Sequence, residues 1–303
     1  MVLDGGSTDS TQSIVQQAIL TSKELNGPEI QLHENPGKYV AEARNLAMTL
    51  LPQSVQFVVE LIGHCTVDSN HLQVRLNEWN RLSDHYDNPL AALGVRVLSR
   101  EGNHGTAESW IEGALSSAFG SGNGQFDSFT VHGETKVPAF AMHSREAILR
   151  VNGWDTNFIT SQDSDLSMRL LEHNYAVART PETFVRMSKR SGLKKWWRMG
   201  HRYGFWRMKI LQKYPTRASA REFLPWIGLV STLSLLFFSQ TLGFLLPLMY
   251  LLVLLIEGIR YSIKSGRAST LLGVPLCLAI LHTSFSIGLL DGLFRKGRAP
   301  RDR

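Results

Sequence analysis

Acidic side chains gather at three places in the sequence where they could take part in catalysis. The first is the turn Asp4-Gly5-Gly6-Ser7-Thr8-Asp9, the second is Glu60 with His64 close behind it, and the third is Gln162-Asp163-Ser164-Asp165. Carboxylates placed at strand ends or helix starts act as general bases or, together with an imidazole, as metal ligands. The sequence therefore offers candidates for both kinds of chemistry.

Each cluster also has an ordinary structural explanation. Thr8 or Asp9 could cap the helix that follows the first turn. The helix dipole favours Asp163 and Asp165 at a helix start, and Asp165 with Arg169 four residues on makes a common helix pair. Glu60 and His64 could simply end a strand. The residue types alone leave both interpretations open.

The elements that must position these clusters alternate along the chain. We expect helices after Asp9 and over residues 40–51, 72–82, 145–151 and 162–174, and strands or extended segments over residues 2–3, 30–33, 55–61, 90–97 and 130–143. This alternation predicts a mostly parallel α/β sheet. Ligands of such sheets bind outside the carboxyl ends of the strands, where the Asp4–Asp9 turn would lie.

Residues 101–127 are rich in Gly and Ser. We expect a helix over residues 109–118, but within a mobile connection rather than a core element.

The C-terminal third differs from the rest in hydropathy. The chain has 303 residues, yet residues 224–256 hold no charged side chain and residues 270–290 form a second uncharged run. About 20 apolar residues are enough to cross a bilayer as a helix, so we expect a membrane region. A break near residues 239–243 predicts a hairpin of two helices. Residues 270–290 either cross as a third helix or lie in the surface as a re-entrant or interfacial helix.

A basic stretch precedes the first apolar run. Residues 186–221 hold twelve Lys or Arg and no Asp or Glu, within a formal net charge of +6. Such a stretch favours a juxtamembrane segment at anionic lipids on the cytoplasmic side, over a solvated helix or a nucleic-acid site. Its aromatic residues favour the membrane, because Trp and Tyr are enriched at interfaces: Trp196, Trp197, Tyr203, Phe205 and Trp206. Only Cys65 and Cys277 are present, so a disulfide framework is not expected.

Taken in order, the motifs resemble glycosyltransferase family 2. They are the Asp4–Asp9 turn, Ala43-Arg44-Asn45-Leu46, a strand ending near His64, Gly153-Trp154-Asp155, the Gln162–Leu166 cluster, and Arg202-Tyr203-Gly204-Phe205-Trp206-Arg207. The similarity is greatest to bacterial enzymes of the succinoglycan type and covers residues 1 to about 215. It implies an α/β GT-A (Rossmann-like) nucleotide-sugar domain over 1–185, a basic segment over 186–223, two or three membrane helices over 224–294, and a basic tail over 295–303.

The resemblance also implies roles for particular residues. Asp163 would be the base that deprotonates the acceptor hydroxyl in an inverting transfer, supported by Asp165, Arg169 and Gln162. The nucleotide sugar, expected to be a UDP-sugar, would bind at Asp4, Gly6, Ser7, Asp9, Arg44, Asn45 and Arg202. Within that set Asp4 would meet the base and Arg202 the diphosphate. The acceptor would be a lipid-linked glycan at the cytoplasmic face of the inner (plasma) membrane, with no nucleic acid involved.

The sequence departs from the family pattern in two respects. Ile62 stands where the family carries the Asp that holds a metal ion, which leaves Glu60 and His64 as the candidate ligands for Mg²⁺ or Mn²⁺, and Gln162 replaces the usual Glu. The strand, loop and helix that normally precede the Asp4–Asp9 turn are missing, which predicts a fragment or a misplaced start.

Two other functions remain open from the sequence. One is a polyprenyl-phosphate glycosyltransferase, which uses the lipid phosphate itself as acceptor. The other is a degenerate, inactive family member that serves as a membrane assembly component.

Overall fold

The computed structural model describes residues 1–120, 129–189 and 191–297. The last part of the predicted mobile connection and most of the predicted basic tail lie outside these residues. In chain order the elements are β1 (Val2–Asp4), α1 (Thr11–Glu24), β2 (Leu32–Glu34), α2 (Val40–Leu50), β3 (Phe57–Val59), β4 (Cys65–Thr66), α3 (His71–Ser83), β5 (Leu90–Ser99), α4 (Thr106–Ser116), β6 (Gly133–Glu134), β7 (Met142–Ser144), α5 (Arg145–Arg150), α6 (Gln162–Glu172), β8 (Ala176–Met187), α7 (Leu193–Lys213), a 3₁₀ turn (Pro215–Arg217), α8 (Ala220–Phe238), α9 (Gln240–Ser265) and α10 (Thr270–Phe294).

The main sheet has the strand order β3-β7-β5-β8-β4, with β6 also paired to β8. Among the described strands of this sheet, only β5 and β8 run parallel to each other. β7 is antiparallel to β3 and β5, and β4 and β6 are antiparallel to β8. β1 and β2 form a separate parallel pair. The α/β class is confirmed, but the prediction of a mostly parallel sheet is wrong, because β7 inserts in the reverse direction between β3 and β5.

Helices cover both faces of the main sheet. Successive strand residues face opposite sides, so Leu93 packs with Trp79 and Leu82 of α3, while Ala92 packs with α2, α5 and α6. Leu82, Ala92 and Leu93 are fully buried. Helices therefore cover both faces of β5, and this packing holds the sheet from which the polar clusters extend.

The predicted mobile connection contains a core element instead. In α4, Ile111 and Ala114 are fully buried against Val274 and Cys277 of α10. The prediction was wrong because Gly and Ser around the helix suggested a loop, whereas the apolar side of α4 is covered by a helix far away in the sequence.

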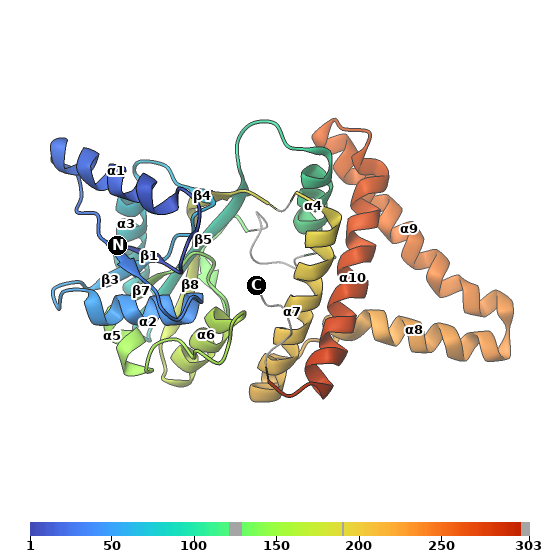
Figure 1. Cartoon of the computed structure of the whole chain (residues 1–303). Helices are drawn as coiled ribbons and strands as arrows, with labels where there is room; N and C mark the ends of the chain where they lie inside the picture. The colour runs from blue at the N-terminus through green and yellow to red at the C-terminus, as the bar shows by residue number, and fades with distance from the viewer. Residues whose placement is uncertain (121–128, 190, 298–303) are drawn as a thin grey trace.

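The basic helix α7 lies alongside α10, as Figure 1 shows. Their backbones approach so closely that a Cβ on Gly204 would collide with the Phe285 carbonyl, and one on Gly288 with the His201 carbonyl. The Trp196 indole donates to the Cys277 carbonyl at 2.8 Å. Glycine is therefore required at this contact by space rather than by backbone angles.

This packing changes the place of the aromatic residues in α7. Trp196 and Phe205 are fully buried in protein and Trp206 nearly so, whereas Trp197 and Tyr203 are exposed. The expectation that these residues meet the bilayer is wrong for the three buried ones, because α10 and the loop before α6 cover them.

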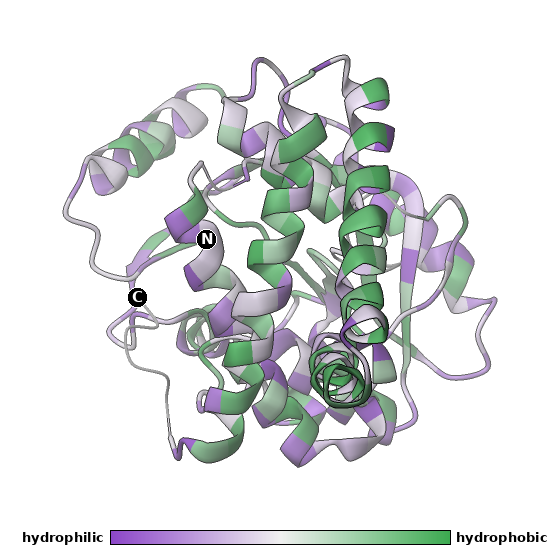
Figure 2. Cartoon of the chain, turned by 90° about the vertical axis from the view of Figure 1, so that its right-hand side faces the viewer, coloured by the Kyte–Doolittle hydropathy of each residue, from purple (hydrophilic) through white to green (hydrophobic). Residues whose placement is uncertain are grey.

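Three helices in the described part of the chain are long and apolar enough to cross a membrane: α8, α9 and α10. The predicted break is confirmed, since α8 ends at Phe238 and α9 begins at Gln240. Residues of α8 are not buried inside the protein, whereas half of the most apolar stretch of α10 is. Figure 1 shows α8 and α9 as a hairpin extending from the body, and Figure 2 shows how apolar residues dominate these helices.

The contact between α7 and α10 can be tested by adding one methyl group. Gly204→Ala should lower the free energy of unfolding by about 1–3 kcal/mol, because the methyl group forces two backbones apart. Gly228→Ala in α8 is the matched control, since nothing lies within 4 Å of its Cβ position. Chemical denaturation in detergent micelles measures both, and equal stabilities of the two variants would contradict the close approach.

The position of α10 gives a second prediction. Because α7 carries Arg198, Arg202 and Lys209 along α10, a fully lipid-embedded α10 would draw these charges toward the hydrocarbon at high cost. We therefore expect α10 to lie at the membrane surface, which leaves two crossings and both chain ends on one side. Protease protection of terminal tags in sealed inverted vesicles tests this, and protection of only one tag would contradict it.

Candidate active site

One arginine joins two of the three acidic clusters. Arg44, on α2, donates from Nη1 to Asp163 Oδ1 and lies with Nη2 2.5 Å from Glu60 Oε2. Glu60 follows β3 directly and Asp163 is in the first turn of α6. The two acids are thus brought together by opposite ends of one guanidinium.

A histidine that the sequence did not single out completes the cluster. His143 on β7 has its Nε2 3.3 Å from Glu60 Oε1, because β7 pairs with β3 and the Glu60 amide donates to the Ala141 carbonyl. Burial alone would raise the pKa of Glu60, yet Arg44 and His143 hold that pKa below its ordinary value. Glu60 is therefore charged at neutral pH.

The Gly153-Trp154-Asp155 motif places the Trp154 ring beneath Arg44. The guanidinium carbon lies 5.4 Å from the centre of the Trp154 ring, a cation–π distance. Asn45 fixes that ring by donating to the Trp154 carbonyl at 2.8 Å and accepting from its amide at 2.9 Å. Gly153 has a φ of +69° and no room for a Cβ beside the Asn45 amide.

Of the two acids in the first turn of α6, only Asp163 is open to a substrate. Its side chain is 41% exposed, whereas that of Asp165 is fully buried. Desolvation by the surrounding protein raises the pKa of Asp163, and Arg44 opposes that rise. A carboxylate of raised pKa is a stronger base, so Asp163 has both the access and the basicity that a general base needs.

Asp165 serves a different purpose, because it ties α6 to the end of α7. It accepts hydrogen bonds from Lys213 at 2.6 Å, from the Tyr214 hydroxyl at 2.9 Å and from Arg169 at 2.9 Å. The pair of Asp165 with Arg169 expected from the sequence is therefore present. Desolvation and the bond to Asp165 raise the pKa of Tyr214 to about 12, so its hydroxyl stays a donor.

The Asp4–Asp9 turn lines a pocket of about 500 Å³. The pocket is lined by the end of β1, the turn, the segment before α2 and the start of α2: Leu3, Gly5, Gly6, Ser7, Asn35, Lys38, Tyr39, Val40 and Ala43. Ala43 precedes Arg44 on α2, so this one helix contributes residues to both the pocket and the cluster at Asp163. The size is that of a small-molecule site.

The turn itself is held by its own acids. Asp4 accepts from the Ser7 amide and hydroxyl and from the Gln12 amide group, and these bonds, that of the Ser7 hydroxyl above all, lower its pKa. Asp9 accepts from the amide and hydroxyl of Thr11 at the start of α1. Gly6 has a φ of +88°, which suits glycine. The predicted contacts of Asp4, Gly6, Ser7 and Asp9 with a nucleotide stay predictions.

Three other predicted site residues are placed as follows. Gln162 is buried at the start of α6. Arg202 is on α7, about 16 Å along the helix from Lys213 at 1.5 Å per residue. His64 precedes β4, and its carbonyl accepts from the Ser188 amide. The roles of Gln162 and Arg202, like that of Asn45 toward a nucleotide, stay predictions.

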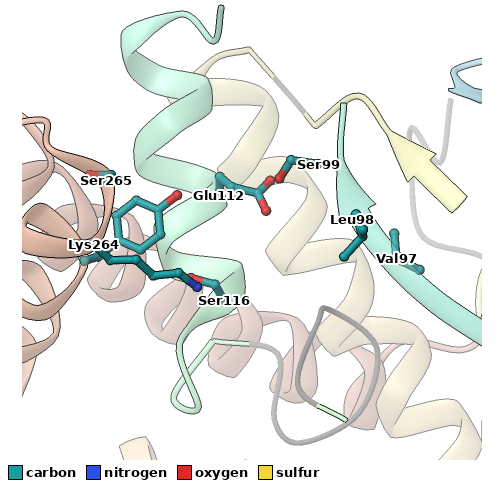
Figure 3. A pocket seen from close by; sticks show the side chains of 8 residues that line it. Val97, Leu98, Ser99, Glu112, Ser116, Lys264 and Ser265 are labelled. Carbon is teal, nitrogen blue, oxygen red and sulfur yellow. The ribbon is translucent and has the colours of Figure 1, made fainter. Parts of the chain in front are cut away.

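A second pocket, of about 220 Å³, lies where the sheet domain meets the membrane helices (Figure 3). It is lined by the end of β5 (Val97, Leu98, Ser99), by Glu112 and Ser116 of α4, and by the last turns of α9 (Tyr261, Lys264, Ser265). Polar groups from α4 and α9 thus face one another beside a strand end.

Sequence comparison identifies the family of this chain. The family described as Glycosyl transferase family group 2 matches residues 126–289, more than half of the chain, from the segment before β6 into α10. The chain belongs to this family. It is a glycosyltransferase, and the α/β fold with apolar C-terminal helices is that of a membrane-associated family member.

Two curated relatives of this glycosyltransferase are similar over longer stretches. The succinoglycan biosynthesis protein ExoA of Rhizobium meliloti (strain 1021) is 25% identical over 231 residues, which cover 74% of this chain and 64% of that protein. The match therefore spans less than two thirds of that relative. A dolichyl N-acetyl-alpha-D-glucosaminyl phosphate 3-beta-D-2,3-diacetamido-2,3-dideoxy-beta-D-glucuronosyltransferase of Methanococcus voltae is 23% identical over 302 residues, 97% of this chain and 87% of that protein.

Members of the family typically use a divalent cation, but the acids of this glycosyltransferase do not fit one. Glu60 is engaged by Arg44 and His143, and Ile62 offers no side-chain ligand. Among the residues described, His, Cys, Asp and Glu nowhere gather in threes as a metal site would require. The predicted pair of Glu60 and His64 is not such a group.

Three residues that contact the candidate site acids were not indicated by the sequence: His143, Lys213 and Tyr214. A lone His in a short strand and basic or aromatic residues in a basic helix carry no local signal. Trp154 did carry one, because its motif was part of the family resemblance.

The tie between α6 and α7 can be tested with two tyrosines of the same helix region. Tyr214→Phe should lower the free energy of unfolding by about 1 kcal/mol, because a buried hydrogen bond to Asp165 is lost. Tyr203→Phe is the control, since Tyr203 is exposed on α7. Loss of its hydroxyl should lower the free energy of unfolding by less than about 0.5 kcal/mol. Denaturant titration in detergent measures both, and a neutral Tyr214→Phe would contradict the tie.

Proposed function

We propose that the enzyme transfers a sugar, with inversion, from a nucleotide sugar to a lipid-linked glycan at the cytoplasmic face of the inner membrane. Asp163 is the general base of this reaction. The observation that carries the proposal is that Asp163 is open to substrate and held by Arg44 of α2, the helix whose first turn also lines the pocket at the Asp4–Asp9 turn.

The chemistry needs one base and one leaving-group site. In a single displacement, Asp163 takes the proton of the acceptor hydroxyl while that oxygen attacks the anomeric carbon. The bond from that carbon to the diphosphate breaks on the opposite face, which inverts the configuration. Negative charge grows on the departing phosphate, and Lys38 in the pocket and Arg202 on α7 are the cations proposed to meet it.

The donor is proposed to be a UDP-sugar held in the pocket of about 500 Å³, with Asp4 near the base. Asp4 already accepts bonds from Ser7 and Gln12, but a carboxylate has about four acceptor positions and can take another. Gly6, Ser7 and Asp9 shape the same turn around the nucleotide.

The acceptor is proposed to approach from the membrane side. A lipid-linked glycan is confined to the bilayer surface, so the α8–α9 hairpin raises its effective concentration at the enzyme. The pocket between β5, α4 and α9 opens at this junction, where Lys264 suits the phosphate of a lipid carrier (Figure 3). A lipid-linked sugar phosphate is also the acceptor named for the relative from Methanococcus voltae.

Replacing the base tests the proposal. Asp163→Asn should reduce sugar transfer in membranes by about 10²–10⁴-fold, because the acceptor hydroxyl loses its proton acceptor while the amide can keep a similar shape. The measurement is incorporation of label from a panel of nucleotide sugars, UDP-sugars first, into extracted lipid.

Glu172→Gln is the matched control on the same helix, because Glu172 is exposed at the far end of α6. Its transfer rate should stay within about twofold of the unaltered enzyme, and both variants should unfold at the same denaturant concentration. Unchanged transfer by Asp163→Asn would remove Asp163 from the role of base.

A further inference from the structure

We infer that Arg44 is a built-in cation that bridges the strand-end acid and the catalytic base, so that sugar transfer by this enzyme does not depend on a divalent metal ion. This inference rests on the proposed function, since it concerns the same site. It departs from the usual metal use of the family.

The first support is geometric. Arg44 contacts Glu60 with one terminal nitrogen and Asp163 with the other, so the two acids that a metal ion would have to share are already joined. The second oxygen of Glu60 lies 3.3 Å from His143. A divalent ion that bridged the two acids would have to displace Arg44, because one oxygen of each acid is already bound to it.

The second support is the charge of Arg44. A guanidinium stays protonated in proteins, and the pKa of Arg44, which burial alone would lower, is raised by Asp163 and Glu60. A divalent ion at van der Waals distance from this fixed positive charge is repelled. The repulsion is strong because the side chains of Arg44 and Glu60 are both only about one-seventh exposed, which weakens solvent screening.

The third support is the set of contacts that fixes Arg44. The Trp154 ring lies beneath the guanidinium. Asn45 holds the backbone of Trp154 in place, because its side chain donates to the Trp154 carbonyl and accepts from the Trp154 amide. A mobile surface arginine lacks an aromatic ring of this kind beneath its guanidinium. Arg44 is thus a preorganised positioning residue for Asp163.

The deciding experiment uses the complete, unaltered enzyme in membranes washed with EDTA. Sugar transfer with EDTA present should stay within about twofold of the rate with added Mg²⁺ or Mn²⁺. A loss of tenfold or more in EDTA, restored by either ion, would overturn the inference while leaving the proposed function intact.

A second readout does not depend on turnover. Binding of UDP, GDP, CDP and ADP is followed by quenching of tryptophan fluorescence in the purified full chain. At least one nucleoside diphosphate should bind with the same Kd, within about twofold, in EDTA and in Mn²⁺. Binding that appears only with Mn²⁺, or with none of the four, overturns the inference even if no transfer activity is found.

A variant tests the bridge itself. Arg44→Lys keeps the charge but, as a point charge, it cannot span both acids, so kcat in EDTA should fall at least tenfold while KM for the donor changes less than threefold. Arg81→Lys is the matched control, because Arg81 forms only a half-exposed pair with Glu78 on α3. Equal kcat for Arg44→Lys and the unaltered enzyme would overturn the bridge.

Discussion

The ion pairs of Arg44 set the geometry of the whole site. Three parts of the chain converge on this side chain: Glu60 from the end of β3, Asp163 from the start of α6, and the Trp154 ring from the loop between α5 and α6. Two buried or partly buried acids that close together would repel each other without a cation between them. The guanidinium removes that repulsion and also fixes which carboxylate oxygen remains free for chemistry.

The remainder of the catalytic domain can be understood as support for this contact. β7 brings His143 to Glu60 only because it runs antiparallel between β3 and β5. Asp165, fully buried, fastens α6 to α7, so the helix that carries Asp163 cannot shift without breaking bonds to Lys213 and Tyr214. Two acids that are two residues apart therefore differ in position: Asp163 is open to substrate, whereas Asp165 is buried and holds α6 to α7.

The helix α7 connects the site to the membrane region. At its end it contacts Asp165, and along its length its glycines let it lie directly against α10. One helix therefore contacts both the membrane region and the helix that carries Asp163. The burial of Trp196 and Phe205 in this contact explains why a basic segment holds aromatic residues without presenting all of them to lipid.

The sequence by itself determined most of the helices and the apolar hairpin, because helix periodicity, turn residues and hydropathy act over a few residues. It did not indicate the long strand β8. The starts of α2 and α6, the break at Ser239 and the family motifs followed from such local patterns. Asp163 was singled out in the same way, by its motif.

Tertiary structure alone decided which groups meet. Arg44 and Asp163 are 119 positions apart, and nothing local to Arg44 indicates that it faces two acids. The direction of β7, the core position of α4 and the burial of three α7 aromatics likewise depend on partners distant in the chain, because a side chain's surroundings are set by the folded packing. The sequence thus singled out Glu60 and Asp163 as candidates, and the folded structure decided that Arg44 lies between them.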